Sequence, residues 1–221
     1  MKIATWNLER LKHLRKLDEI IACCNTVDAD ILVLTEYDDR VVLNYPFEAS
    51  TLLLHALDAS FYNRFERRVK IYSKYPIIRV HETYDPYTTC CAEITTTNGP
   101  LLVYGTILGI YGNRSENFKS DFPRQVEDLK RLSALGPVCY AGDLNMTFSD
   151  NYYFTKAGRN DLEQAFTALD MVNVTRDLRE AIDHIVVSRS YLGDAAFSLL
   201  EWNVDKGLSD HKGVSLSLNL K

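Results

Sequence analysis

The chain has 221 residues, of which 46% are hydrophobic and 25% are charged, a balance typical of a globular protein rather than of a disordered chain. Its formal net charge of −5 argues against a long basic footprint for duplex nucleic acid, although metal-binding carboxylates keep an acidic nuclease possible. The five cysteines form two adjacent pairs and one single residue without a CxxC spacing, which argues against a disulfide framework and a zinc ribbon.

The first elements are predicted to be a strand, a helix and a strand. Ile3–Trp6 forms a short apolar strand. Residues 13–25 place apolar side chains at helical steps of three and four, and Ile31–Leu34 is apolar on both faces. This order predicts a crossover unit in a mixed sheet.

The middle of the chain is predicted to be rich in strands. Loops and a helical piece near 51–58 precede a strand at 69–73, and Pro76 separates it from a strand at 77–80. Strands at 90–96 and 101–107 flank Asn98-Gly99, a strong hairpin signal.

The remainder alternates helices and strands. The spacing predicts a helix over 118–135, ended by Gly136-Pro137, and a short helix over 161–169. Strands are expected at 138–141, 182–187, 197–202 and 213–218. Since no linker or repeat divides the chain, we expect one compact α/β domain over residues 1–221 with two packed sheets.

The N-terminus is too short and polar for a signal peptide, and no apolar run approaches the roughly 20 residues of a membrane helix. Reduced cysteines suit a reducing compartment. We therefore expect a soluble, cytoplasmic protein; the oligomeric state stays open.

Polar fragments follow or interrupt apolar runs where strands should end. They supply carboxylates, carboxamides and a histidine, which a site for Mg²⁺ and a phosphate ester requires. The fragments are Trp6-Asn7-Leu8-Glu9, Thr35-Glu36, Gly142-Asp143-Leu144-Asn145, Ile182-Asp183-His184 and Ser209-Asp210-His211.

Each fragment has an ordinary alternative. Glu36 could be a solvated loop residue, and Asn7 or Asn145 could serve turn chemistry. In an extended segment, Asp143 and Asn145 would project on the same side and could hold a water and a phosphate oxygen. Their combination, rather than any single fragment, indicates a site.

Two histidines compete for the catalytic role. Asp183 can orient His211, fix its tautomer and raise its pKa, making it a base or a phosphate-stabilising cation. His184 alternates with Asp183 along one strand and should face the opposite side. We interpret His184 as a core residue.

The fragments resemble the signature of the endonuclease/exonuclease/phosphatase superfamily over nearly the whole chain. The resemblance implies a four-layer α/β/β/α sandwich of two packed mixed β-sheets and a metal-dependent phosphoesterase using Mg²⁺ or Mn²⁺. It places Glu36 as the principal metal ligand with Asn7 and Asp210, and Glu9 as an acidic residue near the metal. The remaining implied roles are water and phosphate positioning by Asp143 and Asn145, phosphate contact or base catalysis by His211, and orientation of that histidine by Asp183.

One departure concerns the segment Gly105-Thr106-Ile107-Leu108. Ile107 stands where many members carry a second catalytic histidine and repair enzymes a tyrosine, and isoleucine cannot donate a proton. Tyr111, Asn113 and Arg114 in the following loop are candidate substrate-binding residues that could substitute.

A basic cluster precedes this region, and we interpret it as an exposed strand face with solvated charges. The alternative is a surface that steers a polyanion. Its members are Arg64, Arg67, Arg68, Lys70, Lys74 and Arg79.

Three functional classes follow. The first is a nuclease that cuts phosphodiesters in DNA or RNA. The second is a phosphatase or phosphodiesterase of a lipid headgroup, an inositol phosphate or another small ester. The third is a binding module that lost activity, which Ile107 leaves open. We place the nuclease first.

Overall fold

The computed structural model describes residues 1–219. Its strands are β1 Lys2–Asn7, β2 Ile31–Asp38, β3 Phe47–Ser50, β4 Glu66–Ser73, β5 Ile77–His81, β6 Thr89–Thr96, β7 Gly99–Ile107, β8 Val138–Asp143, β9 Met171–Asn173, β10 Asp183–Ser188, β11 Ala196–Trp202 and β12 Gly213–Asn219. Its helices are α1 Leu17–Val27, α2 Glu116–Ser133, α3 Lys156–Ala168 and α4 Arg189–Leu192, with short 3-10 turns at Glu9–Leu11, Leu14–Lys16 and Leu54–Ala56. None of the helices within residues 1–219 combines the length and apolar character needed to cross a bilayer.

The strands form two mixed six-stranded sheets. One has the order β11-β12-β1-β2-β4-β3 and the other β5-β6-β7-β8-β10-β9. Each sheet contains one parallel pair, β1 with β2 and β7 with β8, joined by crossover helices α1 and α2. All other pairs within residues 1–219 are antiparallel.

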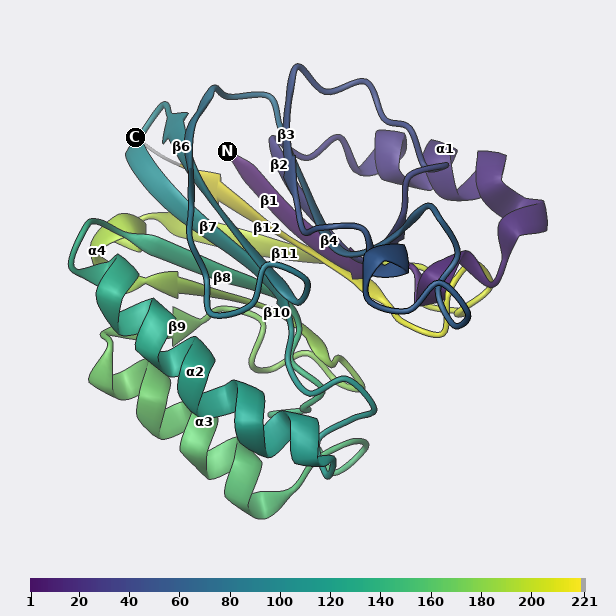
Figure 1. The fold of residues 1–221 in the computed structure, drawn as a ribbon. Coiled ribbons are helices and arrows are strands. Elements are labelled where there is room, and N and C mark those ends of the chain that lie inside the picture. Colours follow the sequence, from purple (N-terminus) through teal and green to yellow (C-terminus); the bar gives the residue numbers. More distant parts are fainter. Residues whose placement is uncertain (220–221) are drawn as a thin grey trace.

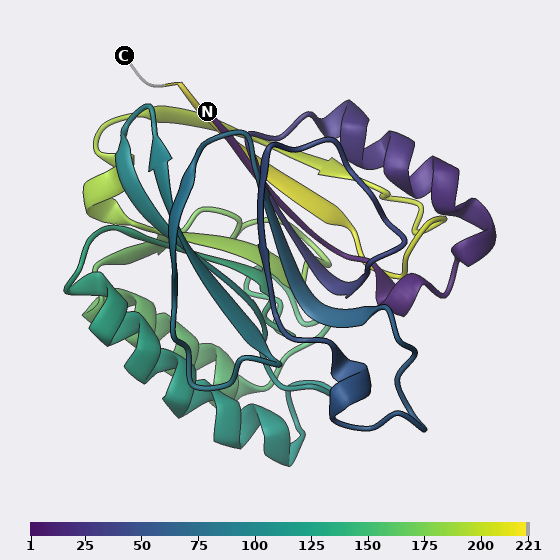
Figure 2. The same ribbon diagram turned by 45° about the horizontal axis from the view of Figure 1, so that its top comes forward.

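The sheets pack face to face, and helices cover their outer faces (Figures 1 and 2). One apolar core lies between the sheets and includes Val33, Val69 and Val103. A second lies under α2 and α3, and a third lies under α1. The predicted α/β/β/α sandwich is confirmed, because the central strands offer one face to the partner sheet and the other to a helix layer.

The observed boundaries matter for the site. β2 and β8 run further than predicted, so that Glu36 lies inside β2 and Asp143 is the last residue of β8. The short strands β3 and β9 and the four-residue helix α4 were not predicted. Their short, mixed sequences have no clear periodicity, so tertiary pairing decides their conformation.

Gly142 fixes the exit of β8. Its φ of 137° lies in a region that side-chain-bearing residues rarely adopt. A Cβ atom at this position would also collide with the carbonyl oxygen of Thr106 on β7. Glycine is therefore required where the chain delivers Asp143 to the sheet end.

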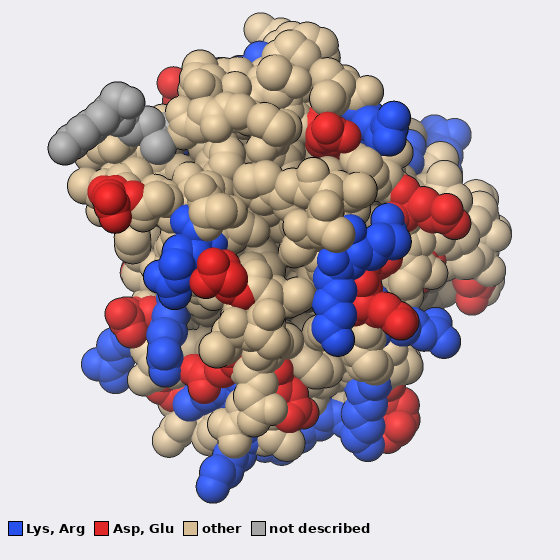
Figure 3. Space-filling model, turned by 90° about the vertical axis from the view of Figure 1, so that its left-hand side faces the viewer, with Lys and Arg blue, Asp and Glu red and all other residues tan. Residues whose placement is uncertain are grey.

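Charged side chains of both signs lie beside one another on the side of the molecule shown in Figure 3, between broad uncharged areas. This face offers no continuous basic stripe. It gives no long footprint for a nucleic-acid backbone, in keeping with the acidic net charge.

Candidate active site

The predicted site residues converge where strands from both sheets end. Asn7 closes β1, Glu36 lies near the end of β2, and Asp143 closes β8. Asp183 begins β10, which runs antiparallel to β8, so it lies directly beside Asp143 in the register. His211 comes from the loop between β11 and β12.

Asp143 links the two sheets. Its Oδ2 accepts a hydrogen bond from Nδ2 of Asn7 at 3.1 Å, and its Oδ1 accepts the backbone N–H of Asn145 at 2.8 Å. Asn145 has φ 50°, so the expectation of an extended segment after Asp143 is wrong. The chain turns sharply instead, and Nδ2 of Asn145 bonds the carbonyls of Leu108 and Gly109, which fixes the carboxamide at the site.

The surroundings of Asp143 favour its protonated form. Burial raises the pKa of its carboxyl to about 7, the nearby His211 opposes this effect, and the Asp183 and Glu36 carboxyls add to it. A carboxyl group of this kind can accept a proton near neutral pH. That property suits a group which positions and activates a water molecule.

His211 is held by Asp183, as predicted. The distance from Nδ1 of His211 to Oδ2 of Asp183 is 2.6 Å. Burial disfavours the imidazolium, but the Asp183 charge and hydrogen bond outweigh it and raise the pKa of His211 to about 10. Near neutral pH the ring is therefore a cation that donates hydrogen bonds, which favours the phosphate-stabilising role over the role of base.

The loop that carries His211 is anchored from several sides. The backbone carbonyl of His211 accepts hydrogen bonds from the Trp6 indole at 3.0 Å and from Asn203 at 2.7 Å. The Ser209 hydroxyl donates to the carbonyl of Asn7 at 2.7 Å. The loop therefore keeps His211 in register with the end of β1.

His184 is a core residue, as predicted. Its Nδ1 lies 2.9 Å from the Thr175 hydroxyl, its Nε2 lies 2.8 Å from the Met146 carbonyl, and its ring meets Phe148 edge-on. Burial lowers the pKa of His184 to about 4, so the ring is neutral near pH 7. It supports the fold behind the site.

Glu36 occupies an irregular position inside β2. Its φ is 46°, and both Leu34 and Tyr37 pack in the core under α1, although residues three apart in a regular strand face opposite ways. The irregularity at Glu36 therefore interrupts the alternation. Its carboxylate has no hydrogen-bond or ion-pair partner among residues 1–219, and burial raises the pKa of this carboxyl.

The carboxylates of Glu9 and Asp210 differ in how available they are to bind a metal ion. Glu9 accepts hydrogen bonds from Nζ of Lys12 at 2.8 Å and from the backbone N–H of Asp210 at 3.0 Å, so both its oxygens already have partners. The Asp210 side chain is 61% exposed and lies 3.5 Å from Nε2 of His211. Glu9 thus orients the loop, while Asp210 presents its carboxylate to the cleft.

The oxygen-rich donor set suits a hard divalent ion. Glu36 offers a carboxylate without a partner, Asp210 offers an exposed one, and Oδ1 of Asn7 accepts only the Glu9 backbone N–H. Asp143, Asp183 and His211 also place one possible ligand atom each within 4.8 Å of one another. Because the His211–Asp183 contact at 2.6 Å holds a proton between its atoms, we interpret this trio as the proton-handling part of the site.

Comparison with known families supports this arrangement. The model of the endonuclease/exonuclease/phosphatase family matches residues 4–211. The chain belongs to this family. It is therefore a phosphoesterase with the fold that its sequence predicts.

Solved structures share the fold at low sequence identity. A 3' phosphatase, NExo, from Neisseria, bound to a product DNA hairpin, is 18% identical with a TM-score of 0.71, covering 100% of both chains. An AP endonuclease from Archaeoglobus fulgidus is 16% identical with a TM-score of 0.67, also over 100% of both chains. An AP endonuclease from Leishmania major is 14% identical with a TM-score of 0.72, covering 100% of this chain and 88% of its own. No curated protein matches the chain.

The family's second histidine has no replacement at the same position. Ile107 is buried at the end of β7 beside Asp143. Of the loop residues proposed to compensate, Tyr111 is 76% exposed and Arg114 lines a separate groove with Phe118 and Phe122. Asn113 is buried and donates its amide to the Asn145 carbonyl at 2.8 Å. Asn113 thus supports Asn145, and substrate contact by the three residues stays a prediction.

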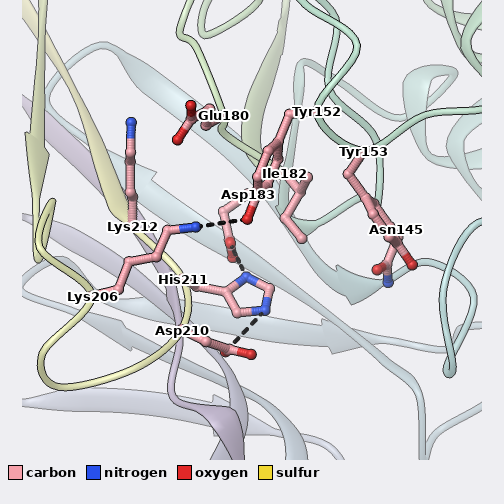
Figure 4. Close-up of a pocket in the computed structure, with 10 residues that line it drawn as sticks. All are labelled: Asn145, Tyr152, Tyr153, Glu180, Ile182, Asp183, Lys206, Asp210, His211 and Lys212. Atoms are coloured by element: carbon pink, nitrogen blue, oxygen red, sulfur yellow. Dashed lines mark hydrogen bonds and ion pairs between the residues drawn. The ribbon is translucent and has the colours of Figure 1, made fainter.

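A pocket of about 280 Å³ adjoins His211 and was not predicted from the sequence. Besides Asn145, Asp183, Asp210 and His211, it is lined by Tyr152, Tyr153, Glu180, Ile182, Lys206 and Lys212 (Figure 4). Nζ of Lys206 reaches the Tyr152 hydroxyl at 3.0 Å, so that the two loops meet at the rim. These residues have no motif spacing, and only the fold brings them together.

Proposed function

We propose that this phosphoesterase hydrolyses phosphodiester bonds in DNA or RNA with Mg²⁺, with Mn²⁺ as the alternative ion. One observation carries the proposal: a buried Asp143 lies beside the His211–Asp183 pair, which is joined at 2.6 Å. This arrangement supplies an acceptor for the proton of a water molecule and a cation for the phosphate.

The roles of the chain's own residues follow from their contacts. Asp143 accepts a proton from the attacking water. The backbone N–H of Asn145 donates a hydrogen bond to the Asp143 carboxylate and holds it in position. Protonated His211 donates a hydrogen bond from Nε2 to a non-bridging phosphate oxygen, while Asp183 holds the ring. Since the charge on that oxygen grows toward the transition state, this interaction lowers the barrier.

Glu36, Asp210 and Asn7 would hold the metal ion, with Glu9 orienting the Asp210 loop. When bound, the ion polarises the phosphoryl group and stabilises the leaving oxygen. No side chain at position 107 can protonate that oxygen, so a water molecule fills this role.

A nucleic-acid substrate is supported by the pocket beside His211. It places two tyrosine rings and two lysines next to the phosphate position. Aromatic rings stack on bases or sugars, and lysines pair with phosphates. Among the similar structures, one is an AP endonuclease, and the NExo phosphatase is bound to a product DNA hairpin.

A second candidate is a phosphatase that removes a terminal phosphate. The resemblance to a 3' phosphatase over the full length of both chains favours it, since the same site can act on a monoester. Inositol phosphates, lipid headgroups and other small esters are further members of this class.

A substrate panel with Mg²⁺ tests the proposal. It contains plasmid DNA, single strands, an abasic duplex, RNA, an oligonucleotide with a 3' phosphate, inositol phosphates and sphingomyelin. Cleavage or shortening of a polynucleotide supports the nuclease, and release of inorganic phosphate alone supports the phosphatase. A folded protein that hydrolyses none of them contradicts both.

Matched variants tie any hydrolysis to this site. Asp143→Ala and His211→Ala should each lower kcat by on the order of a hundredfold or more. The controls Asp194→Ala and His55→Ala change exposed residues of the same types and should retain wild-type rates. Near-wild-type rates for both site variants would contradict the assignment.

We further propose that the protein acts in the cytoplasm. The cysteines are all free thiols, and all except Cys23 are buried, which suits a reducing compartment. Cell fractionation with a soluble marker tests this location.

A further inference from the structure

The basic segment of β4 differs from its sequence interpretation as a solvated face. Three of its six members have acidic partners from elsewhere in the chain: Arg67 pairs with Asp39, Lys70 with Glu48, and Lys74 with Asp28. Arg68 and Lys70 are also buried. Arg64 and Arg79 are exposed, so Arg68 is the buried member of the cluster that forms no ion pair within residues 1–219.

Arg68 is a buried cation whose side-chain hydrogen-bond partner is a neutral hydroxyl group. Its residue is 6% exposed, and Nη2 donates to the Tyr62 hydroxyl at 2.7 Å. Among residues 1–219 it forms no ion pair, whereas neighbouring Arg10 binds Glu66 through two nitrogens. A buried charge that is not paired directly with an opposite charge is costly, and an anionic ligand offsets that cost.

Arg68 lies next to the metal-binding edge of the site. β2 and β4 pair through Thr35 with Val69 and through Tyr37 with Arg67, so Arg68 faces Glu36 across the two strands.

His211 and Arg68 flank the same carboxylate from two sides. In the strand order β12-β1-β2-β4, the loop of His211 leads into β12 and Arg68 lies on β4, with Asn7 and Glu36 between them. A phosphate placed at Glu36 through a metal ion would therefore lie between two cations.

We propose that the Arg68 guanidinium binds a non-bridging phosphate oxygen of the substrate, on the side of Glu36 away from His211. This inference rests on the proposed phosphoester substrate of the same site. Arginine suits the task because its planar fork matches phosphate and keeps its charge. The Tyr62 hydroxyl holds one edge of the fork and leaves the remaining donors for the ligand.

Binding of inorganic phosphate in the presence of Mg²⁺ tests this role without turnover. Calorimetry on Arg68→Gln should show an affinity lower by on the order of tenfold or more, with Arg68→Lys intermediate. The control Arg64→Gln removes the same charge from an exposed position in the same segment and should bind like wild type. Wild-type affinity in Arg68→Gln would overturn the inference.

Two further measurements keep the test decisive. If Arg68→Gln does not fold, Tyr62→Phe takes its place in the binding experiment. Loss of the hydroxyl should weaken phosphate binding with little change in thermal stability. Unchanged phosphate binding in Tyr62→Phe overturns the inference. With an active substrate, Arg68→Lys should raise KM more than it lowers kcat. A protein that hydrolyses nothing on the panel contradicts the proposed function, whereas hydrolysis with unchanged KM and phosphate affinity in the Arg68 variants contradicts this inference alone.

Discussion

Ile107 and Asp143 lie side by side at the ends of the parallel strands β7 and β8. Asp143 continues the same row to Asp183 on β10, so one carboxyl group has an isoleucine on one side and a second carboxyl on the other. Both neighbours favour the protonated form of Asp143, the first by excluding water and the second by charge. In this chain, Asp143 is therefore favoured as the group of the site that takes up a proton.

Replacing Ile107 with Asn should lower the pKa of Asp143, because an amide donor stabilises the carboxylate. Since Asp143 acts as an acceptor, activity should then persist to lower pH, and the acidic limb of the pH–rate profile should move down. Kinetics across the acidic range measure this shift, with Ile107→Val as the apolar control. An unchanged acidic limb in Ile107→Asn would show that another group sets it.

Asp143→Asn should inactivate the enzyme and stabilise the metal-free fold. The pKa of the folded state, about 7, lies above the ordinary value of 3.8, so the contribution of this group to stability falls as pH rises between these values. The variant does not lose stability in this way as pH rises. Above pH 7, its free energy of unfolding should therefore be about 1 to 4 kcal/mol higher than that of wild type. Urea unfolding with a chelator, at about pH 5 and about pH 8, gives the difference.

The sign of that difference is the decisive result. A gain that is present at about pH 5 and larger at about pH 8 agrees with a raised pKa. Equal or lower stability of Asp143→Asn at both pH values would mean that Asp143 is ionised in the folded protein without penalty.

Asp183→Asn should lower the pKa of His211 by removing its opposite charge. In wild type that pKa is raised from 6.5 to about 10, so the imidazolium and the stability it provides are complete below 6.5 and are lost as pH rises through about 10. The variant should lose activity at lower pH on the alkaline limb, and kcat near neutral pH should drop by on the order of a hundredfold. NMR titration of the histidine ring gives the pKa directly, and Asp194→Asn is the charge-matched control.

Glu36→Gln should weaken Mg²⁺ binding without destabilising the fold. Removing a carboxylate without a protein partner costs no hydrogen bond, but it takes away the principal ligand, so the Mg²⁺ concentration for half-maximal activity should rise by about tenfold or more. A chelator should abolish activity in wild type, and added Mg²⁺ should restore it. Glu19→Gln, an exposed glutamate on α1, is the control.

Calorimetric Mg²⁺ binding to the same variants separates affinity from chemistry. If Glu36→Gln binds Mg²⁺ like wild type, Glu36 is not a ligand, whatever its effect on the rate.

The sequence by itself determined the fold and the inventory of the site. The apolar strand runs, the helical steps of α1 and α2, and the Asn98-Gly99 turn are local signals that predict two packed sheets, whereas the helix layers outside the sheets followed from the family resemblance. The alternation of Asp183 and His184 along one strand also separated the buried His184 from His211, the histidine proposed as catalytic, because neighbouring strand residues face opposite sides.

Only the tertiary structure decided the electrostatics and the surroundings of that site. Ile107 became the neighbour of Asp143 through strand register, and Glu36 entered a strand whose local irregularity interrupts the alternation. Arg68 changed from one charge in a basic run to a buried cation opposite Glu36. Charge and burial depend on distances between residues far apart in the chain, and those distances follow from how strands pair and sheets pack.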